Sequence, residues 1–225
     1  ALALYEELQF WLGERPAFYF PEPNPLFYEK AGWGVGTRKD RLQVLTLLAR
    51  HLIPGSPHPT DPPIMVAPVR AVMTRTVPRR EFLKHTRTLR LNQQVTLEAL
   101  IRSWLDAGYD HAHIVVQAGQ FSRRGGIVDV WPPGEPQPIR IEFFGDEIDT
   151  MRSFDPASQR TVSRIESITV GPAREILPSA AEKAGLALRD LAEFRIPLAQ
   201  LIAGSMLDFL PDETVIVLDD QECMA

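Results

Sequence analysis

The 225-residue sequence contains a single cysteine, Cys223, and no run of the roughly 18 apolar residues that a bilayer-spanning helix needs. One thiol can form neither an internal disulfide nor a multi-thiolate metal site, so the sequence indicates a protein of a reducing compartment. The N-terminus also lacks the basic and apolar regions of a secretory signal peptide. These absences predict a cytoplasmic protein that does not associate with membranes.

Motifs for nucleotide or metal chemistry are also missing. No segment matches the G-x-x-x-x-G-K-[ST] phosphate loop, and the glycine-rich stretch 31–36 (AGWGVG) has neither the lysine nor the hydroxyl that phosphate and magnesium require. The segment VIVLDD, ending at Asp219 and Asp220, resembles the strand before a magnesium-binding carboxylate, but its partner loop is absent. His111 and His113 have no acidic or thiol ligand nearby, and the lone cysteine has no nearby histidine. We therefore expect no catalytic residue, cofactor or metal in this chain.

The composition is that of a folded protein. Hydrophobic residues make up 44% of the chain, which is enough for one large or two modest domains with buried cores and excludes a disordered or fibrous protein. The sequence starts without a methionine inside a helix-like segment and stops just after a strand-like one. We therefore expect it to be a piece of a longer protein.

Charge is distributed unevenly behind the net value of −5. Residues 70–104 contain eight basic and two acidic residues, whereas residues 176–225 contain nine acidic and three basic residues. Such a basic segment is typical of a surface for nucleic acid or an acidic partner. A solvated face that pairs with the acidic half of the same molecule explains it equally well, and the sequence leaves both possibilities open.

The first third of the chain alternates helix and strand patterns in the manner of an α/β domain. We predict helices over 2–12 and 39–53 and strands over 17–20 and 64–69. Five prolines lie within 54–63, so that stretch is predicted to be a loop, since proline cannot donate a backbone hydrogen bond.

The middle of the chain is rich in strand patterns. After an edge strand at 86–91 we expect a helix that begins after Thr96 and ends at Gly108. The strands expected next are 113–117, 125–132, 138–145, 147–154 and 160–170, with the proline-rich PPGEPQ segment as a hairpin turn between the second and third.

The remainder returns to an α/β pattern, with a helix expected over 180–194 and a final strand over 214–218. The simplest architecture is a β-rich module inserted into an α/β domain. We place the module at 81–175 and the flanking α/β parts at 1–80 and 176–225.

Four motifs between Gly119 and Thr161 connect this module to a known family. They are G-x-F-x-x-R-G at 119–125, I-V-D-V-W-P at 127–132, R-I-E-F-F-G-D-E-I-D at 140–149 and F-D-x-x-S-Q-R-T at 154–161. In this order and spacing the segment is similar to the insertion module shared by UvrB and the transcription-repair coupling factor Mfd. The S-Q-R-T exit favours the coupling factor over UvrB.

This resemblance implies a degenerate RecA-like (P-loop NTPase-type) domain interrupted by a small β-rich α+β module that binds UvrA. The function it implies is non-catalytic recruitment of UvrA in transcription-coupled nucleotide excision repair. In the parent protein, separate motor domains would use ATP and magnesium, and other domains would contact RNA polymerase and duplex DNA. The alternatives are the equivalent fragment of UvrB, or a nucleic-acid-binding module that uses the basic segment.

Strand alternation picks out candidate binding residues in 139–144. Arg140, Glu142 and Phe144 lie on the face opposite the three apolar residues between which they alternate. An arginine, a carboxylate and an exposed aromatic in a row are typical of interface hot spots. The same pattern also fits side chains that merely pair with neighbouring strands.

The resemblance assigns roles to several of these positions. In the family, residues that match Arg124, Arg140 and Phe144 contact UvrA, whereas the match at Glu142 is weaker. Arg123 is a further basic candidate, because the second arginine usual in UvrB is displaced by one position in this sequence.

Overall fold

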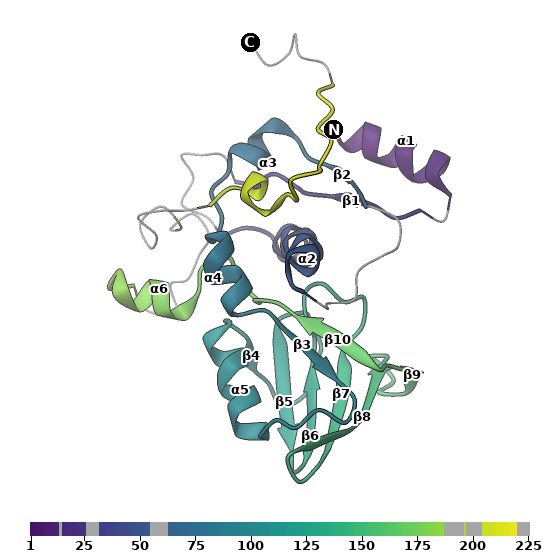
Figure 1. Ribbon diagram of the computed structural model, residues 1–225, viewed down its shortest axis with the longest axis vertical. Helices are drawn as coiled ribbons and strands as arrows, with labels where there is room; N and C mark the ends of the chain where they lie inside the picture. The colour runs from purple at the N-terminus through teal and green to yellow at the C-terminus, as the bar shows by residue number, and fades with distance from the viewer. Residues whose placement is uncertain (14, 26–31, 55–62, 187–195, 197–203, 220–225) are drawn as a thin grey trace.

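The computed structural model describes residues 1–13, 15–25, 32–54, 63–186, 196 and 204–219 (Figure 1). It is a mixed α/β structure with several sheets, as predicted. The helices are α1 (Leu2–Leu12), α2 (Val35–Leu52), α3 (Val69–Met73), α4 (Arg79–Lys84), α5 (Leu97–Asp106), α6 (Pro178–Lys183) and the 3₁₀ helix η3 (Met206–Phe209). The strands are β1 (Ala17–Tyr19), β2 (Ile64–Val66), β3 (Arg87–Arg90), β4 (Asp110–His111), β5 (Gln120–Arg124), β6 (Ile127–Val130), β7 (Ile139–Phe144), β8 (Glu147–Phe154), β9 (Thr161–Arg164) and β10 (Ser167–Val170).

The β-rich part is a six-stranded sheet in which the strands follow one another in chain order from β4 to β9. Strands β4 and β5 are parallel, and every later neighbouring pair is antiparallel. Two-residue turns join β5 to β6 and β7 to β8, and their first residues, Gly125 and Gly145, have φ of +62°. Glycine adopts this left-handed conformation without strain, so both hairpins close tightly.

One face of this sheet packs against α5 and the antiparallel β3–β10 ribbon, as Figure 1 shows. Helix α5 begins as predicted, because the Thr96 hydroxyl accepts a hydrogen bond from the Ala99 backbone N–H at 3.3 Å. Its buried residues Leu97, Leu100 and Trp104 join the apolar side chains of the sheet in one core. Helix α5 therefore fixes which face of the sheet is turned away from water.

The α/β part, which lies above the β-rich part in Figure 1 and includes α2, has a second core. Strands β1 and β2 form a two-stranded parallel sheet, and residues of α2, α4 and η3 bury their apolar side chains with Phe20 from the end of β1. Phe82 and Phe209 meet edge to face with their ring centroids 5.4 Å apart. This core contains segments from both ends of the chain.

Helix α2 connects the two parts of the molecule through two ion pairs, one buried and one partly exposed. Arg41 donates from Nε and Nη2 to the two oxygens of Glu175 at 2.7 and 3.1 Å, and neither side chain reaches solvent. In the last turn of the helix, Arg50 pairs with Glu135, in the loop between β6 and β7, at 2.5 Å. Both contacts hold the β-rich part against the α/β part.

Several sequence-based predictions of elements are wrong. Residues 113–117 form no strand, because the chain bends there between β4 and β5. The predicted helix over 180–194 is α6, which begins two residues earlier and ends at Lys183, where Gly185 follows with φ of +69°. Residues 187–194 lie outside the described residues.

The C-terminal prediction of a strand over 214–218 is also wrong. Residues 215–218 are exposed, and a strand needs a neighbouring edge for its backbone hydrogen bonds, which the described residues do not supply. Asp220, Cys223 and the proline-rich stretch 55–62 lie outside the described residues. Within the part of the chain that is described, no helix is long and apolar enough to cross a membrane.

Candidate functional site

The face of the six-stranded sheet opposite α5 carries two rows of polar side chains, and we call it the outer face. Residues directly opposite each other on antiparallel strands point to the same side. The first row, read across β5 to β9, is Ser122, Asp129, Arg140, Arg152 and Arg164. The second row, read across β5 to β8, is Arg124, Ile127, Glu142 and Thr150.

Asp129 organises the first row. Its carboxylate is 2% exposed and accepts hydrogen bonds from Nε and Nη2 of Arg140 at 2.7 and 2.8 Å. It also accepts one from Nη2 of Arg124 at 3.1 Å. Two-point hydrogen bonding of this kind fixes the plane of a guanidinium. One buried carboxylate thus orients two of the predicted binding residues.

The two arginines differ in what they can offer a partner. The Arg140 side chain is 18% exposed, its Nη2 also donates to Gln159 at 3.1 Å, and its guanidinium carbon lies 4.6 Å from the Phe154 ring centroid. Hydrogen bonding of its guanidinium to the Asp129 carboxylate raises the pKa of Arg140 above its ordinary value. The Arg124 side chain is 57% exposed and uses only one nitrogen for Asp129. Arg124 is therefore the more accessible of the two.

Glu142 is held within the sheet. It accepts a hydrogen bond from the Thr150 hydroxyl at 3.0 Å and a short one from Nη2 of Arg152. Both partners lie on the neighbouring strand β8, which matches the interpretation of internal cross-strand pairing. Its carboxylate contributes charge balance to the outer face.

Phe144 is the exposed aromatic of this face. It ends β7 beside the Gly145 turn, and 83% of its surface is accessible to solvent. Ile127, which is also exposed, lies in the second row at the same end of the sheet. A large apolar side chain that is exposed next to oriented arginines is the composition of a protein-docking surface.

The structure does not bring Arg123 to the outer face. Its strand partner is Val128, whose side chain belongs to the core, and its Nη2 donates to Glu98 of α5 at 3.1 Å. Neighbouring residues of a strand point to opposite sides, so Arg123 and Arg124 cannot serve one flat surface together. The further basic candidate Arg123 therefore lies on the opposite side of the sheet from Arg124.

Asp129 and Arg152 are residues of this face that the sequence analysis did not single out. Asp129 lies between Val128 and Val130, both of which are buried on the core side. The alternation of Asp129 with these two valines in the sequence could have placed its carboxylate on the polar face of the strand. Its two arginine partners lie 5 and 11 residues away, and only the strand register brings them together.

The glycine-rich stretch leads into helix α2, which begins at Val35. The Asn24 side-chain oxygen accepts hydrogen bonds from the Gly34 backbone N–H at 2.9 Å and from the Thr37 hydroxyl at 2.6 Å. Trp33 is buried, and the Arg41 guanidinium carbon lies 4.6 Å from its ring centroid. The first turn of α2 is thus used for contacts within the protein.

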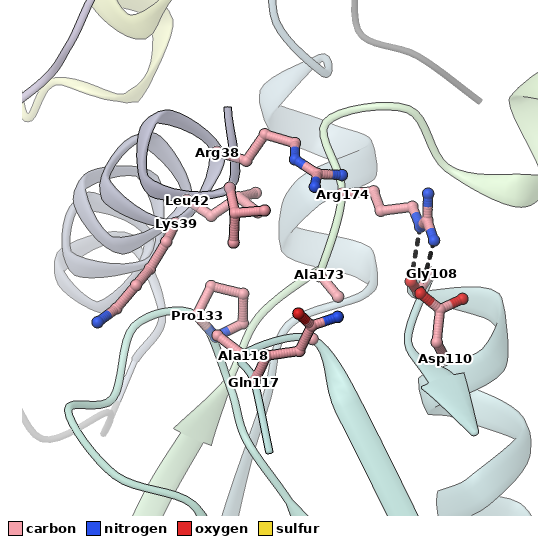
Figure 2. A pocket seen from close by; sticks show the side chains of 12 residues that line it. Arg38, Lys39, Leu42, Gly108, Asp110, Gln117, Ala118, Pro133, Ala173 and Arg174 are labelled. Atoms are coloured by element: carbon pink, nitrogen blue, oxygen red, sulfur yellow. Dashed lines mark hydrogen bonds and ion pairs between the residues drawn. The ribbon is translucent and has the colours of Figure 1, made fainter. Parts of the chain in front are cut away.

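A small pocket lies between α2 and the loops of the β-rich part (Figure 2). Arg174 crosses one side of it and donates to the Asp110 carboxylate at 2.7 Å and to the Gly108 carbonyl at 3.1 Å. Figure 2 shows the Lys39 side chain extending away from Arg174. None of the outer-face residues lines it.

The other candidate features are dispersed. Among the described residues, no three histidine, cysteine or acidic side chains are grouped closely enough to hold a metal ion. In the basic segment, Arg70 pairs with Glu22 at 3.8 Å and Lys84 with Glu81 at 3.9 Å. The acidic C-terminal part contacts the same region, because Ser205 donates to the Val72 carbonyl at 3.0 Å.

Comparison with known proteins gives a family for this architecture. Residues 88–176 match the model of the UvrB interaction domain. The chain is 32% identical to the transcription-repair-coupling factor of Bacillus subtilis over 180 residues, which are 80% of the chain and 14% of that protein. It is 32% identical to that of Myxococcus xanthus over 216 residues (92% and 17%), and 38% identical to that of Escherichia coli over 113 residues (50% and 10%).

The part of the chain that carries the outer face is therefore a UvrB interaction domain. The chain as a whole is similar to a part of the transcription-repair-coupling factors, and the resemblance inferred from its motifs is confirmed. It spans only 10–17% of the length of these three relatives.

Proposed function

We propose that this chain recruits UvrA in transcription-coupled nucleotide excision repair, and that UvrA docks on the outer face. The observation that carries the proposal is the exposed Phe144 at the end of a face whose arginines are oriented by the buried Asp129. A buried aromatic anchor surrounded by polar contacts is the usual arrangement of a strong protein interface.

The contacts divide into two roles. Phe144 supplies apolar area that leaves water on binding, and the exposed edge of Arg124 can hold a partner carboxylate. Arg140 and Glu142 keep their neighbours in place, since both are already hydrogen-bonded within the sheet. Because the side chains are ordered before binding, less conformational entropy is lost on association.

We also propose that the chain is non-catalytic and takes no cofactor. Its α/β part would be a degenerate RecA-like domain in which Asn24 and Trp33 fill the place where a phosphate loop would otherwise bind nucleotide. The parent protein would be an ATP-dependent DNA translocase, with ATP and magnesium in separate motor domains and with contacts to RNA polymerase and duplex DNA made elsewhere. Calorimetry with MgATP should detect no binding to this chain at micromolar concentration, and measurable binding would contradict this part of the proposal.

Transcription-coupled repair is preferred over the equivalent role in UvrB because the relatives compared above carry the coupling-factor name. A nucleic-acid-binding role for the basic segment is disfavoured because Gly204 and Ser205, at the start of a C-terminal stretch rich in acidic residues, contact Thr76 and Val72 within that segment. Submicromolar binding of duplex DNA at physiological salt would favour that role instead.

The direct test of recruitment is titration of purified UvrA into the 225-residue chain by calorimetry at several salt concentrations. We expect saturable binding that weakens only modestly with salt, because an aromatic anchor depends little on screening. Absence of binding, or a steep loss of affinity with salt as for phosphate contacts, would overturn the proposal.

A further inference from the structure

Three arginines stand side by side across the outer face. Arg140 of β7 lies directly opposite Arg152 of β8, which in turn lies directly opposite Arg164 of β9. Like charges in directly opposed positions destabilise an antiparallel pair. The sheet therefore carries a charge arrangement that its own stability does not favour.

The carboxylates of the sheet compensate only part of this charge. Arg140 is paired with Asp129, and Arg152 is paired with Glu142. Arg164 is exposed and makes no ion pair or side-chain hydrogen bond with any residue that the structure describes. Together with Arg124, the two rows contain four arginines and two carboxylates, and a third carboxylate of the outer face, Glu147, lies directly opposite Phe144 at the end of the sheet.

The surroundings of Arg164 are those of a binding surface. Val162 lies two residues earlier on β9, faces the same side and is exposed. Strand β9 is the edge of the six-stranded sheet, so a partner can reach it from the side. Apolar side chains and an arginine without an internal partner thus meet at this edge.

We infer that Arg152 and Arg164 extend the docking face to the edge of the sheet and bind the carboxylates of an acidic segment on the partner. This inference rests on the proposed function. Arg164 offers its whole guanidinium, whereas Arg152 offers the part that Glu142 does not use. Planar guanidinium groups bind carboxylates through two parallel hydrogen bonds, and a segment with at least two carboxylates would match the excess positive charge.

A protein segment fits this row better than a nucleic acid does. Asp129 and Glu142 lie within the two rows and would repel phosphates that follow the same path. The exposed Phe144 and Val162 flank the arginines and favour apolar contacts. The partner surface is therefore expected to combine acidic and apolar side chains.

The test is a charge reversal, Arg164→Glu, in the full 225-residue chain. Its matched control is Arg102→Glu, which reverses an exposed arginine of α5 on the opposite side of the sheet. We expect Arg164→Glu to weaken binding of purified UvrA by at least about tenfold, and Arg102→Glu to change it by less than about twofold. The melting temperature of Arg164→Glu should equal or exceed that of the parent chain, because the new carboxylate would face Arg152.

The outcomes separate this inference from the function on which it rests. If Phe144→Ala weakens UvrA binding but Arg164→Glu behaves like Arg102→Glu, the arginine row has no docking role and the proposed function still stands. If the parent chain does not bind UvrA, the proposed function fails and this inference fails with it. If Arg164→Glu reduces duplex DNA binding and leaves UvrA binding unchanged, the row serves nucleic acid and the inference is overturned.

Discussion

The buried ion pair between Arg41 and Glu175 offers a sharp test of how the α/β part and the β-rich part are held together. Arg41 is completely buried and has further contacts with the Pro21 carbonyl, at 3.1 Å, and with the Phe20 ring, 4.1 Å from its centroid. Glu175→Gln removes the negative charge and keeps the size of the side chain. The guanidinium then remains buried without its counter-ion.

The expected cost follows from this burial. Removing one partner of a buried ion pair destabilises a protein by about 3–5 kcal/mol, against a total stability of roughly 5–15 kcal/mol. For a chain of this size the melting temperature should fall by roughly 6–20 °C. Replacing both residues by apolar ones, as in Arg41→Met with Glu175→Leu, should cost less than the single change, because no charge is left unpaired.

The assay is thermal and urea denaturation followed by circular dichroism at neutral pH. Glu166→Gln is the matched control, since Glu166 is exposed and its neutralisation should change stability by less than about 0.5 kcal/mol. If Glu175→Gln has the same melting temperature as the parent chain, the pair does not hold the two parts together. A double variant less stable than the single one would also contradict the reasoning.

Three further changes test the outer face and its support. Arg140→Ala should lower the free energy of unfolding by about 3 kcal/mol in urea denaturation, because it leaves the buried Asp129 carboxylate largely unpaired; an unchanged midpoint would contradict this. Tyr109→Phe should cost about 1–2 kcal/mol in the same assay, because the buried hydroxyl, whose pKa burial raises well above its ordinary value, donates at 2.8 Å to the carbonyl that follows β10. The Ser158 hydroxyl and backbone N–H lower the pKa of Asp155, so the stability this carboxylate contributes is present above its ordinary pKa and is lost as pH falls through the lowered value. Ser158→Ala should move the Asp155 pKa upward in an NMR titration, and an unmoved pKa would exclude this cause.

Arg140 has both a structural contact and a proposed role in docking. Strand alternation alone predicts only that Arg140 lies on the face opposite the core. In the structure its guanidinium is the main partner of a carboxylate that is 2% exposed. Loss of binding in Arg140→Ala would therefore combine a docking effect with a folding effect, whereas Arg124 and Phe144 are exposed enough to report docking alone.

Local patterns in the sequence predicted much of the β-rich part. The alternation in 139–144 placed Ile139 and Ile141 in the core and Phe144 outside, as the structure has them. The start of α5 after Thr96 was predicted from capping chemistry. The alternation of apolar residues and the capping of helices depend on residues that are close together in the chain. Both can therefore be predicted from a single sequence.

Features that depend on distant contacts were not predicted. Whether Arg123 or Arg124 lies on the outer face depends on the register of β5 with β6, and the contacts of Asp129 depend on pairing across three strands. The apolar pattern of 214–218 predicted a strand, but a strand also needs an edge to pair with. Register and edge availability are properties of the whole fold.

In the function that we propose, UvrA docks on the outer face with Phe144 as its anchor. The most direct measurement compares the affinity of UvrA for Phe144→Ala with its affinity for Phe10→Ala, since the two phenylalanines are 83% and 79% exposed and lie on different parts of the molecule. Phe144→Ala should weaken binding by about thirtyfold, or about 2 kcal/mol, with an unchanged melting temperature, while Phe10→Ala should bind like the parent chain. Equal affinities for the two variants would show that the outer face is not the docking site.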